Sequence, residues 1–213
     1  MTIILANGDY PTHPIPVKLL YSNNPVVCCD GAANNFIAHG GNPIAIIGDC
    51  DSVCNQIRNQ YREKLHPIFE QETNDLTKAV NYLIEQGEND IVILGATGKR
   101  ECHTLGNISL LMKYQCMGIH VTMYTDHCKI IPVHDSIELT THIGQQISII
   151  NYNAHNFRSQ GLKYPLYDFN EWWQGTLNEC IDQTVSISAK GNYLVLLDYV
   201  DPDTIVASTQ LWD

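Results

Sequence analysis

Two carboxylates spaced two residues apart follow an apolar run in the first half of the chain. Asp49 and Asp51 stand in the stretch GDCDS, directly after the apolar residues 44–47. Such a run, bounded by Asn-Pro and by Gly48, predicts a strand buried on both faces, as in a parallel sheet. Open α/β sheets bind ligands at the carboxyl ends of their strands, so both carboxylates could face one cation there. The alternative is that Asp51 or Ser52 caps the following helix.

Two further predicted strands in this half also end in polar residues. Residues 25–29 lead to Asp30 in the stretch DGAAN, and residues 2–6 lead to Asn7 in the turn-prone stretch NGD. The turn at Asn7 can bring backbone N–H groups close to a ligand. Asp30 is a candidate site residue, and its alternative role is that of N-cap for the next helix.

A third acidic position lies at the start of a predicted helix. Apolar spacing predicts this helix over residues 74–86, with Asp75 in its first turn and Lys78 three residues later. Residues three apart are neighbours on a helix surface. The two side chains are therefore either an ordinary helical ion pair or a metal-binding carboxylate beside a phosphate-binding lysine.

A basic, glycine-rich loop follows the clearest strand of the sequence. Residues 90–94 (DIVIL) run into GATGKR, which contains Gly95, Thr97 and Arg100. Two glycines, a threonine and two bases after a buried strand predict a phosphate-binding loop, with backbone N–H groups and Arg100 as donors. The spacing matches neither the P-loop GxxxxGK[ST] nor GxGxxG. His103, just beyond the loop, is either a site residue or an ordinary solvent-facing histidine.

An α/β domain is needed to position these residues. Apolar spacing predicts helices and strands in alternation, and this alternation is typical of a mostly parallel sheet covered by helices. Residues 11–24 contain three prolines within six residues and support no clear prediction. The remaining predicted helices cover residues 31–39, 52–64 and 102–115, and the remaining predicted strands cover residues 65–69 and 119–124.

The pattern changes beyond about residue 125 to short alternating segments separated by turn residues. This pattern predicts a smaller, antiparallel, sandwich-like all-β domain. Its predicted strands cover residues 129–133, 136–140, 145–151, 185–189 and 193–199. Residues 161–175 concentrate aromatic side chains, for which core packing is expected; the alternative is a platform for a flat ring or a cation at an interface. These aromatic residues are Tyr164, Tyr167, Phe169, Trp172 and Trp173.

The composition limits the classes of partner. The chain of 213 residues has a formal net charge of -11, and this excess of acid disfavours binding to a nucleic-acid backbone. No apolar stretch reaches about 18 residues and no export signal is evident, so we expect neither a membrane partner nor export. The eight cysteines include no Cys-x-x-Cys pair, which predicts reduced thiols and a cytoplasmic location.

The acidic candidates have a consequence for the ligand. Carboxylates cannot hold a phosphate ester directly, because the two groups repel each other. A divalent cation such as Mg²⁺ must then lie between them. An acidic site that takes a phosphate ester therefore implies a bound metal ion.

Taken in order, these motifs resemble those of the thiamine pyrophosphokinase family. The resemblance is carried by LANG, DGAAN, GDCDS, TNDLTKA, GATGKR, HTLGN and, in the β module, GLKYPL. It implies a Rossmann-like ATP-binding domain over residues 1–125 and a thiamine-binding β-sandwich over residues 126–213. It further implies an enzyme that transfers a diphosphate group from ATP to thiamine, and a homodimer whose site lies between subunits.

The resemblance also implies a role for each candidate residue. Mg²⁺ would be held by Asp49, Asp51 and Asp75, and the catalytic residues would be Asp51, Asp75 and Arg100, with Asp75 a candidate base for the attacking hydroxyl. Transfer of this type needs mainly positioning and charge neutralisation, which a metal ion, Arg and Lys supply. The remaining implied contacts are Asp30 and Gln71 in the substrate cleft, Asn7, Lys78, Gly95, Thr97, His103 and Asn107 around the nucleotide, and Thr176 and Asn178 at thiamine.

Three positions depart from the family pattern. Cys102 stands where an aspartate is usual, Asn35 where an arginine is common, and Leu177 where the family has a serine. These departures bear on a polar contact near the nucleotide and on the thiamine contacts. Cys102 and Leu177, which replace polar family positions, motivate an alternative function, a non-catalytic nucleotide-binding or thiamine-binding sensor. A metal-dependent phosphohydrolase is the other alternative.

Overall fold

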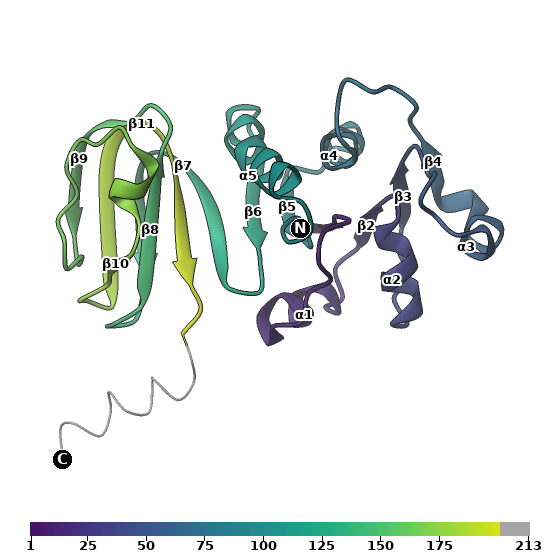
Figure 1. Cartoon of the computed structure of the whole chain (residues 1–213), viewed down its shortest axis with the longest axis horizontal. Coiled ribbons are helices and arrows are strands. Elements are labelled where there is room, and N and C mark those ends of the chain that lie inside the picture. Colours follow the sequence, from purple (N-terminus) through teal and green to yellow (C-terminus); the bar gives the residue numbers. More distant parts are fainter. Residues whose placement is uncertain (201–213) are drawn as a thin grey trace, which may run out of the picture. The chain divides into compact units, whose positions relative to one another are not determined.

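The computed structural model describes residues 1–200, and the chain divides into two compact units (Figure 1). The first unit is Met1–Asp126, and the second is the chain from His127 on. The last part of the second predicted domain, residues 201–213, lies outside the described residues. The first unit contains a parallel sheet and the second contains antiparallel strands.

The first unit, all of whose residues are described, is built on six parallel strands. β1 (Thr2–Leu5) lies between β2 (Val26–Cys29) and β5 (Asp90–Leu94). The sheet continues beyond β2 through β3 and β4, and beyond β5 to β6, which are Ala45–Gly48, Leu65–Pro67 and His120–Tyr124. The strand order therefore reverses between β1 and β5. Such a reversal leaves a crevice for ligands beyond the carboxyl ends of the strands.

Helices cover both faces of this sheet. Parallel crossovers are right-handed, so the reversal of strand order places the later helices on the face opposite the earlier ones. Figure 1 shows α1 and α2 on one side of the sheet and α4 and α5 on the other. The helices are α1 (Pro14–Leu20), α2 (Ala32–Ala38), α3 (Asn55–Gln60), α4 (Asp75–Glu85) and α5 (Glu101–Cys116), with a short 3₁₀ helix, η1, at Arg62–Lys64. None of the helices in residues 1–200 has the length and apolar character needed to cross a membrane.

Alternate strand residues contribute to separate apolar layers on the two faces. On one face, side chains of the strands pack with Leu20, Phe36 and Ile57 from α1, α2 and α3. On the other face, α4 lies against β1, β2 and β3 and buries Leu76 and Leu83. Because the strands are covered on both sides, their carboxyl ends are held in fixed register.

The second unit is antiparallel among its described residues. Its longest strand, β11 (Thr184–Asp198), pairs with β7 (Cys128–Thr140) over most of its length. On the other edge, β11 pairs with β9 (His155–Gln160) in its first half and with β8 (Gln146–Asn151) in its second half. The short β10 (Asn178–Glu179) pairs with β8, and the 3₁₀ helix η2 is Trp172–Gly175. Buried side chains such as Phe157, Val185 and Tyr193 form its core.

Several sequence predictions need correction. Residues 11–24, for which no prediction was possible, contain α1, and the helix predicted over residues 52–64 is only α3 followed by η1. The two short strands predicted over residues 129–133 and 136–140 form the single strand β7, and the two predicted over residues 185–189 and 193–199 form the single strand β11. The polar residues between them mark a register shift, where Gly191 N donates to Asp135 Oδ1 at 2.9 Å. Strand β9 was missed because only Phe157 in it is buried.

A buried hydrogen bond joins α4 to α5 below the carboxyl ends of the strands. The hydroxyl oxygens of Thr77 and Tyr114 lie 2.9 Å apart, and both side chains are buried. We expect Tyr114→Phe to lower the free energy of unfolding by about 1–3 kcal/mol, because it leaves the Thr77 hydroxyl buried without its partner. Urea denaturation measures this change. In the double variant Thr77→Val/Tyr114→Phe the loss should be smaller than the sum of the single losses, and strict additivity would contradict the assignment.

Candidate active site

One cavity opens at the carboxyl ends of the strands of the first unit. Its volume is about 870 Å³, and its walls come from the segments after β1 to β5 and from the first turns of α4 and α5. The strands end at one edge of the sheet, so the sheet brings these distant segments together. The predicted site residues that line it are Asn7, Asp30, Asp49, Asp51, Gln71, Asp75, Lys78, Arg100, His103 and Asn107.

Three carboxylates meet on the β2–β3 side of this cavity. Cys29 pairs with Ile47 in the parallel register, which places Asp30 beside the end of β3. Carboxylate oxygens of Asp30, Asp49 and Asp51 lie within 4.8 Å of one another. Carboxylate oxygens are the ligands that hard divalent cations such as Mg²⁺ prefer. The donor set therefore fits Mg²⁺.

The backbone of the β3 loop brings Asp49 and Asp51 to the same side. Cys50, which separates them, has a φ of 62°, a left-handed conformation that is uncommon for a residue other than glycine. The Arg58 side chain in α3 donates hydrogen bonds to two carbonyl oxygens of the loop, that of Cys50 and that of Val53. The distance from Arg58 Nε to Val53 O is 2.9 Å. Arg58 thus holds the strained loop from the helix that follows it.

Gly48 leaves room for two carboxylates at the end of β3. Its φ is 148°, and a Cβ built there would lie 3.0 Å from Asp30 Cβ and 3.1 Å from Asp75 Oδ1. Only a residue without a side chain allows Asp30 from β2 and Asp75 from α4 to approach this close from two directions.

Neither capping alternative is found in the structure. The N-cap position of α3 is Cys54, and the Ser52 hydroxyl donates instead to Asp51 Oδ1 at 2.8 Å. The N-cap position of α2 is Gly31, and no side chain caps that helix. Asp30 and Asp51 are therefore free of the structural role that capping would have given them.

Asp75 differs from the other carboxylates because a cation lies beside it. Lys78 Nζ is 3.3 Å from Asp75 Oδ1, and the lysine side chain is only 4% exposed. Burial raises the pKa of Asp75, whereas Lys78 lowers it. Burial also raises the pKa of Asp30, and the charges of Asp49 and Asp51 add to this rise. Both shifts reflect carboxylates gathered in a partly dehydrated cleft.

The opposite side of the cavity is basic. It is formed by the loop after β5, which contributes Lys99 and Arg100, and by His103 in the first turn of α5. Lys99 has a φ of 46°, and its Nζ donates to Asn7 O at 2.8 Å. Arg100 is exposed at the N-cap position of α5. Cations and a helix N-terminus on one wall suit a polyanion such as a nucleotide phosphate.

Gly95 and Thr97 belong to the β5 loop but do not line the cavity. Their carbonyl oxygens accept hydrogen bonds from Gly8 N at 2.6 Å and Asp9 N at 2.8 Å, respectively. A Cβ at Gly8 would lie only 2.3 Å from Thr97 O. The two residues therefore hold the β5 loop against the β1 loop, with their carbonyls directed at Gly8 and Asp9.

Asn107 has a comparable positioning role. Its Nδ2 donates to Ala96 O at 2.8 Å, and its Oδ1 accepts from Asn74 Nδ2 at 3.0 Å. Asn74 also caps α4, because its Oδ1 accepts from Thr77 N at 3.0 Å. This network ties the start of α4, which carries Asp75, to the basic loop across the cavity.

The predicted thiamine contacts lie in the second unit. Thr176 is exposed, and its hydroxyl donates to Trp173 O at 2.8 Å. Asn178 is buried, and its amide group exchanges hydrogen bonds with the backbone N and O of Tyr164. Between them, Leu177 is 77% exposed with a φ of 60°. Thr176 is thus accessible, whereas Asn178 holds the segment that contains Tyr164.

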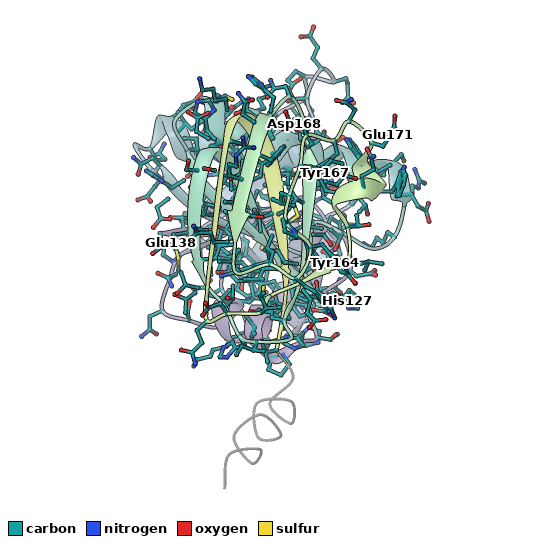
Figure 2. The ribbon with its side chains drawn as sticks, turned by 90° about the vertical axis from the view of Figure 1, so that its left-hand side faces the viewer. His127, Glu138, Tyr164, Tyr167, Asp168 and Glu171 are labelled. Atoms are coloured by element: carbon teal, nitrogen blue, oxygen red, sulfur yellow. The ribbon has the colours of Figure 1, made fainter. Side chains whose placement is uncertain are left out.

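Core packing was the wrong expectation for most of the aromatic cluster. Of the five residues, only Phe169 is buried, and it stacks on Phe157 with ring centroids 5.3 Å apart. Trp173 is 73% exposed, and Trp172 stacks on Tyr152. Tyr164 and Tyr167 are also exposed, on the segment between β9 and η2 (Figure 2). For these exposed side chains the alternative interpretation stays a prediction: a platform for a flat ring or a cation at an interface.

Sequence reasoning missed two residues that shape the site. Arg58 acts through backbone carbonyls and Asn74 through a helix cap, as described above. For Asn74 a signal was present, since Asn immediately before a predicted helix is a common N-cap. Arg58 carried no such signal, because its partners are backbone oxygens that only the folded loop presents. Lys99 was predicted only as one of two bases in a phosphate-binding loop, and its hydrogen bond to Asn7 O was not foreseen.

Known protein families match both units of this chain. A model of the thiamin pyrophosphokinase catalytic domain matches residues 17–123, and a model of the thiamin pyrophosphokinase substrate-binding domain matches residues 129–196. The chain is 29% identical over 171 residues to a thiamine pyrophosphokinase of Bacillus subtilis (strain 168). That alignment covers 75% of this chain and 79% of the relative.

Solved structures show the same fold. The crystal structure of thiamine pyrophosphokinase from Bacillus subtilis matches with a TM-score of 0.77 and 24% identity, over 94% of this chain and 100% of that one. The yeast thiamin pyrophosphokinase structure matches with a TM-score of 0.78 and 18% identity, over 92% and 85% of the two chains. At these identities the structural likeness supports the two-domain fold.

Proposed function

Because the chain belongs to the thiamin pyrophosphokinase family, we propose that it transfers a diphosphate group from ATP to thiamine and releases AMP. The hydroxyl oxygen of thiamine attacks the β-phosphorus of ATP, the bond from that phosphorus to the α–β bridging oxygen breaks, and AMP leaves. ATP serves as co-substrate, and the enzyme is a thiamine diphosphokinase.

The observation that carries this proposal is the division of charge within one cavity. Asp30, Asp49, Asp51 and Asp75 lie toward the ends of β2, β3 and β4, whereas Lys99, Arg100 and His103 follow β5. A metal-bound polyphosphate needs both sets, since the acidic set holds the cation and the basic set neutralises phosphate oxygens. A site with only acidic residues would bind the cation alone, and a site with only basic residues would bind the phosphates alone.

Asp49, Asp51 and Asp75 would hold Mg²⁺. Once bound, Mg²⁺ supplies charge neutralisation for the diphosphate oxygens. The chain's own groups do the remaining work: Arg100 donates hydrogen bonds to phosphate oxygens, and Lys78 orients Asp75 through the contact at Oδ1. Asp75 would accept the proton of the attacking hydroxyl as the general base.

The remaining ligand contacts follow the cavity walls. Asn7, His103 and Lys78 would face the nucleotide, and Asp30 and Gln71 would face the substrate cleft. Gly95, Thr97 and Asn107 would act by holding the nucleotide-binding loops in place. In the second unit, Thr176 would contact thiamine directly, and Asn178 would act indirectly by holding the segment that contains Tyr164. The thiazolium ring is a cation, for which aromatic side chains provide favourable faces.

The domain assignment forms part of the same proposal. Residues 1–125 would be the Rossmann-like ATP-binding domain, supported by the parallel sheet and its strand reversal. Residues 126–213 would be the sandwich-like thiamine-binding domain, supported by antiparallel strands on both edges of β11. We further propose a homodimer with the site between subunits and a cytoplasmic location, which the eight free cysteines support.

The products of the reaction test this function. Purified protein incubated with ATP and Mg²⁺ should release AMP only when thiamine is present, with an equal amount of thiamine diphosphate. Release of ADP, or loss of ATP regardless of thiamine, would indicate a phosphohydrolase. Tight binding of ATP or thiamine without turnover would indicate a sensor.

A further inference from the structure

We propose that Asp30 is itself a ligand of the divalent cation, alongside Asp49 and Asp51, and that it contributes more to cation affinity than Asp75. This inference rests on the proposed function in one respect, the identity of the cation as Mg²⁺. It changes the role of Asp30 from a residue lining the substrate cleft to one that binds the metal ion directly.

The first observation is an orphaned oxygen. Asp30 is 4% exposed, and among the described residues its Oδ1 is buried without a hydrogen-bond partner. An unpaired buried carboxylate oxygen is costly unless a donor or a cation reaches it. Asp30 lines the cavity, so its carboxylate lies next to any ligand bound there.

The second observation is the geometry of its neighbours. A carboxylate oxygen of Asp30 lies within 4.8 Å of those of Asp49 and Asp51. Oxygen ligands on one octahedral Mg²⁺ are about 3–4 Å apart when each lies about 2.1 Å from the ion, so small side-chain adjustments suffice. Asp30 also has a φ of 42°, and such backbone strain often occurs at functional sites.

The contrast with Asp75 gives the inference its direction. Lys78 lies 3.3 Å from Asp75 Oδ1 and partly neutralises this carboxylate. Asp75 is also 36% exposed, so water partly solvates its charge. Asp30 has neither a cationic partner in the described residues nor comparable solvation. A divalent cation therefore gains more from Asp30 than from Asp75.

Titration with Mn²⁺ alone, in the absence of ATP and thiamine, tests this proposal. The variants Asp30→Asn and Asp75→Asn each remove one negative charge from the same cavity, so they are matched for long-range electrostatics. Electron paramagnetic resonance measures the concentration of free Mn²⁺ and hence the affinity. The rise in melting temperature with added Mn²⁺ gives a second, independent measure of binding. Asp30→Ser provides a second substitution in case the asparagine variant does not fold.

We expect Asp30→Asn to weaken Mn²⁺ binding by at least about tenfold, a loss typical of disturbed metal coordination, and Asp75→Asn to weaken it by less. Equal losses in the two variants, or a larger loss in Asp75→Asn, would overturn the proposal. Unchanged Mn²⁺ affinity with a raised KM for thiamine in Asp30→Asn would also overturn it and would assign Asp30 to the substrate. Because the Mn²⁺ titration contains no nucleotide, its result does not depend on whether the protein catalyses diphosphate transfer, and the KM for thiamine is measured separately.

Discussion

Substitution of Asp51 by Asn is expected to lower kcat by about 10²–10³-fold, the loss typical when one preorganised electrostatic partner of a transition state is removed. Asp51 is exposed at the rim of the cavity, and its described side-chain partner is the Ser52 hydroxyl. Its replacement therefore removes charge from the cation site without opening a hole in the core. Steady-state release of AMP at saturating ATP and thiamine measures the effect.

Asp90→Asn is the matched control for this variant. Asp90 is an exposed carboxylate of the same unit, at the amino end of β5 and thus at the opposite edge of the sheet from the cavity. It should retain near-wild-type kcat and melting temperature. Retained activity in Asp51→Asn, or an equal loss in Asp90→Asn, would contradict the assignment of the cation site.

Substitution of Arg100 by Ala should lower kcat/KM by at least about 10²-fold, because the role proposed for the guanidinium is to donate hydrogen bonds to the phosphate oxygens and neutralise their charge. Arg100 lines the cavity at the N-cap position of α5, where its side chain is exposed. Its removal should leave the free energy of unfolding within about 0.5 kcal/mol of the wild type, as is usual for exposed positions. Initial rates over a range of ATP concentrations measure the kinetic change.

Arg62→Ala and Arg100→Lys complete this experiment. Arg62 is exposed in η1, away from the residues that line the cavity, and its loss should have little effect on kcat/KM. Arg100→Lys keeps the charge but loses the forked donor geometry, so it should recover only part of the activity. Full activity in Arg100→Lys would show that charge alone suffices, and full activity in Arg100→Ala would contradict a role in transfer.

The order of the strand-end motifs was enough to predict most of the cavity. Asp49 and Asp51 follow a buried strand, and Asp30 and Arg100 follow two others. Parallel strands end at one edge of a sheet, so proximity follows from strand direction without knowledge of the loops. The cavity is thus largely a consequence of the alternation of strands and helices.

The sequence could not predict which residues act through the backbone. Gly95 and Thr97 looked like ligand donors because glycine and threonine are common in phosphate-binding loops. In the structure neither residue lines the cavity, and their carbonyls accept hydrogen bonds from the β1 loop, a contact that depends on the approach of two segments far apart in sequence. The same holds for Asn178, whose side-chain amide makes hydrogen bonds with the backbone N and O of Tyr164.

The prediction that the aromatic cluster packs in the core was the clearest error of the sequence analysis. Apolar character alone favoured core packing of Trp172 and Trp173, yet β-module core positions are filled by residues such as Phe157 and Tyr193. The polar residues around Gly191 were interpreted as a turn between two strands, whereas they form a register shift within the single strand β11, because a bulge and a turn share the same residue types. Only the pairing partners distinguish the two cases.

The most direct measurement is anomalous diffraction from crystals grown with Mn²⁺ and a non-hydrolysable ATP analogue. The account predicts a manganese peak in the cavity within coordination distance of Asp49 and Asp51, with the analogue's phosphates between the metal and Arg100. A peak elsewhere on the molecule, or phosphates held without any contact between the metal and these two carboxylates, would contradict it.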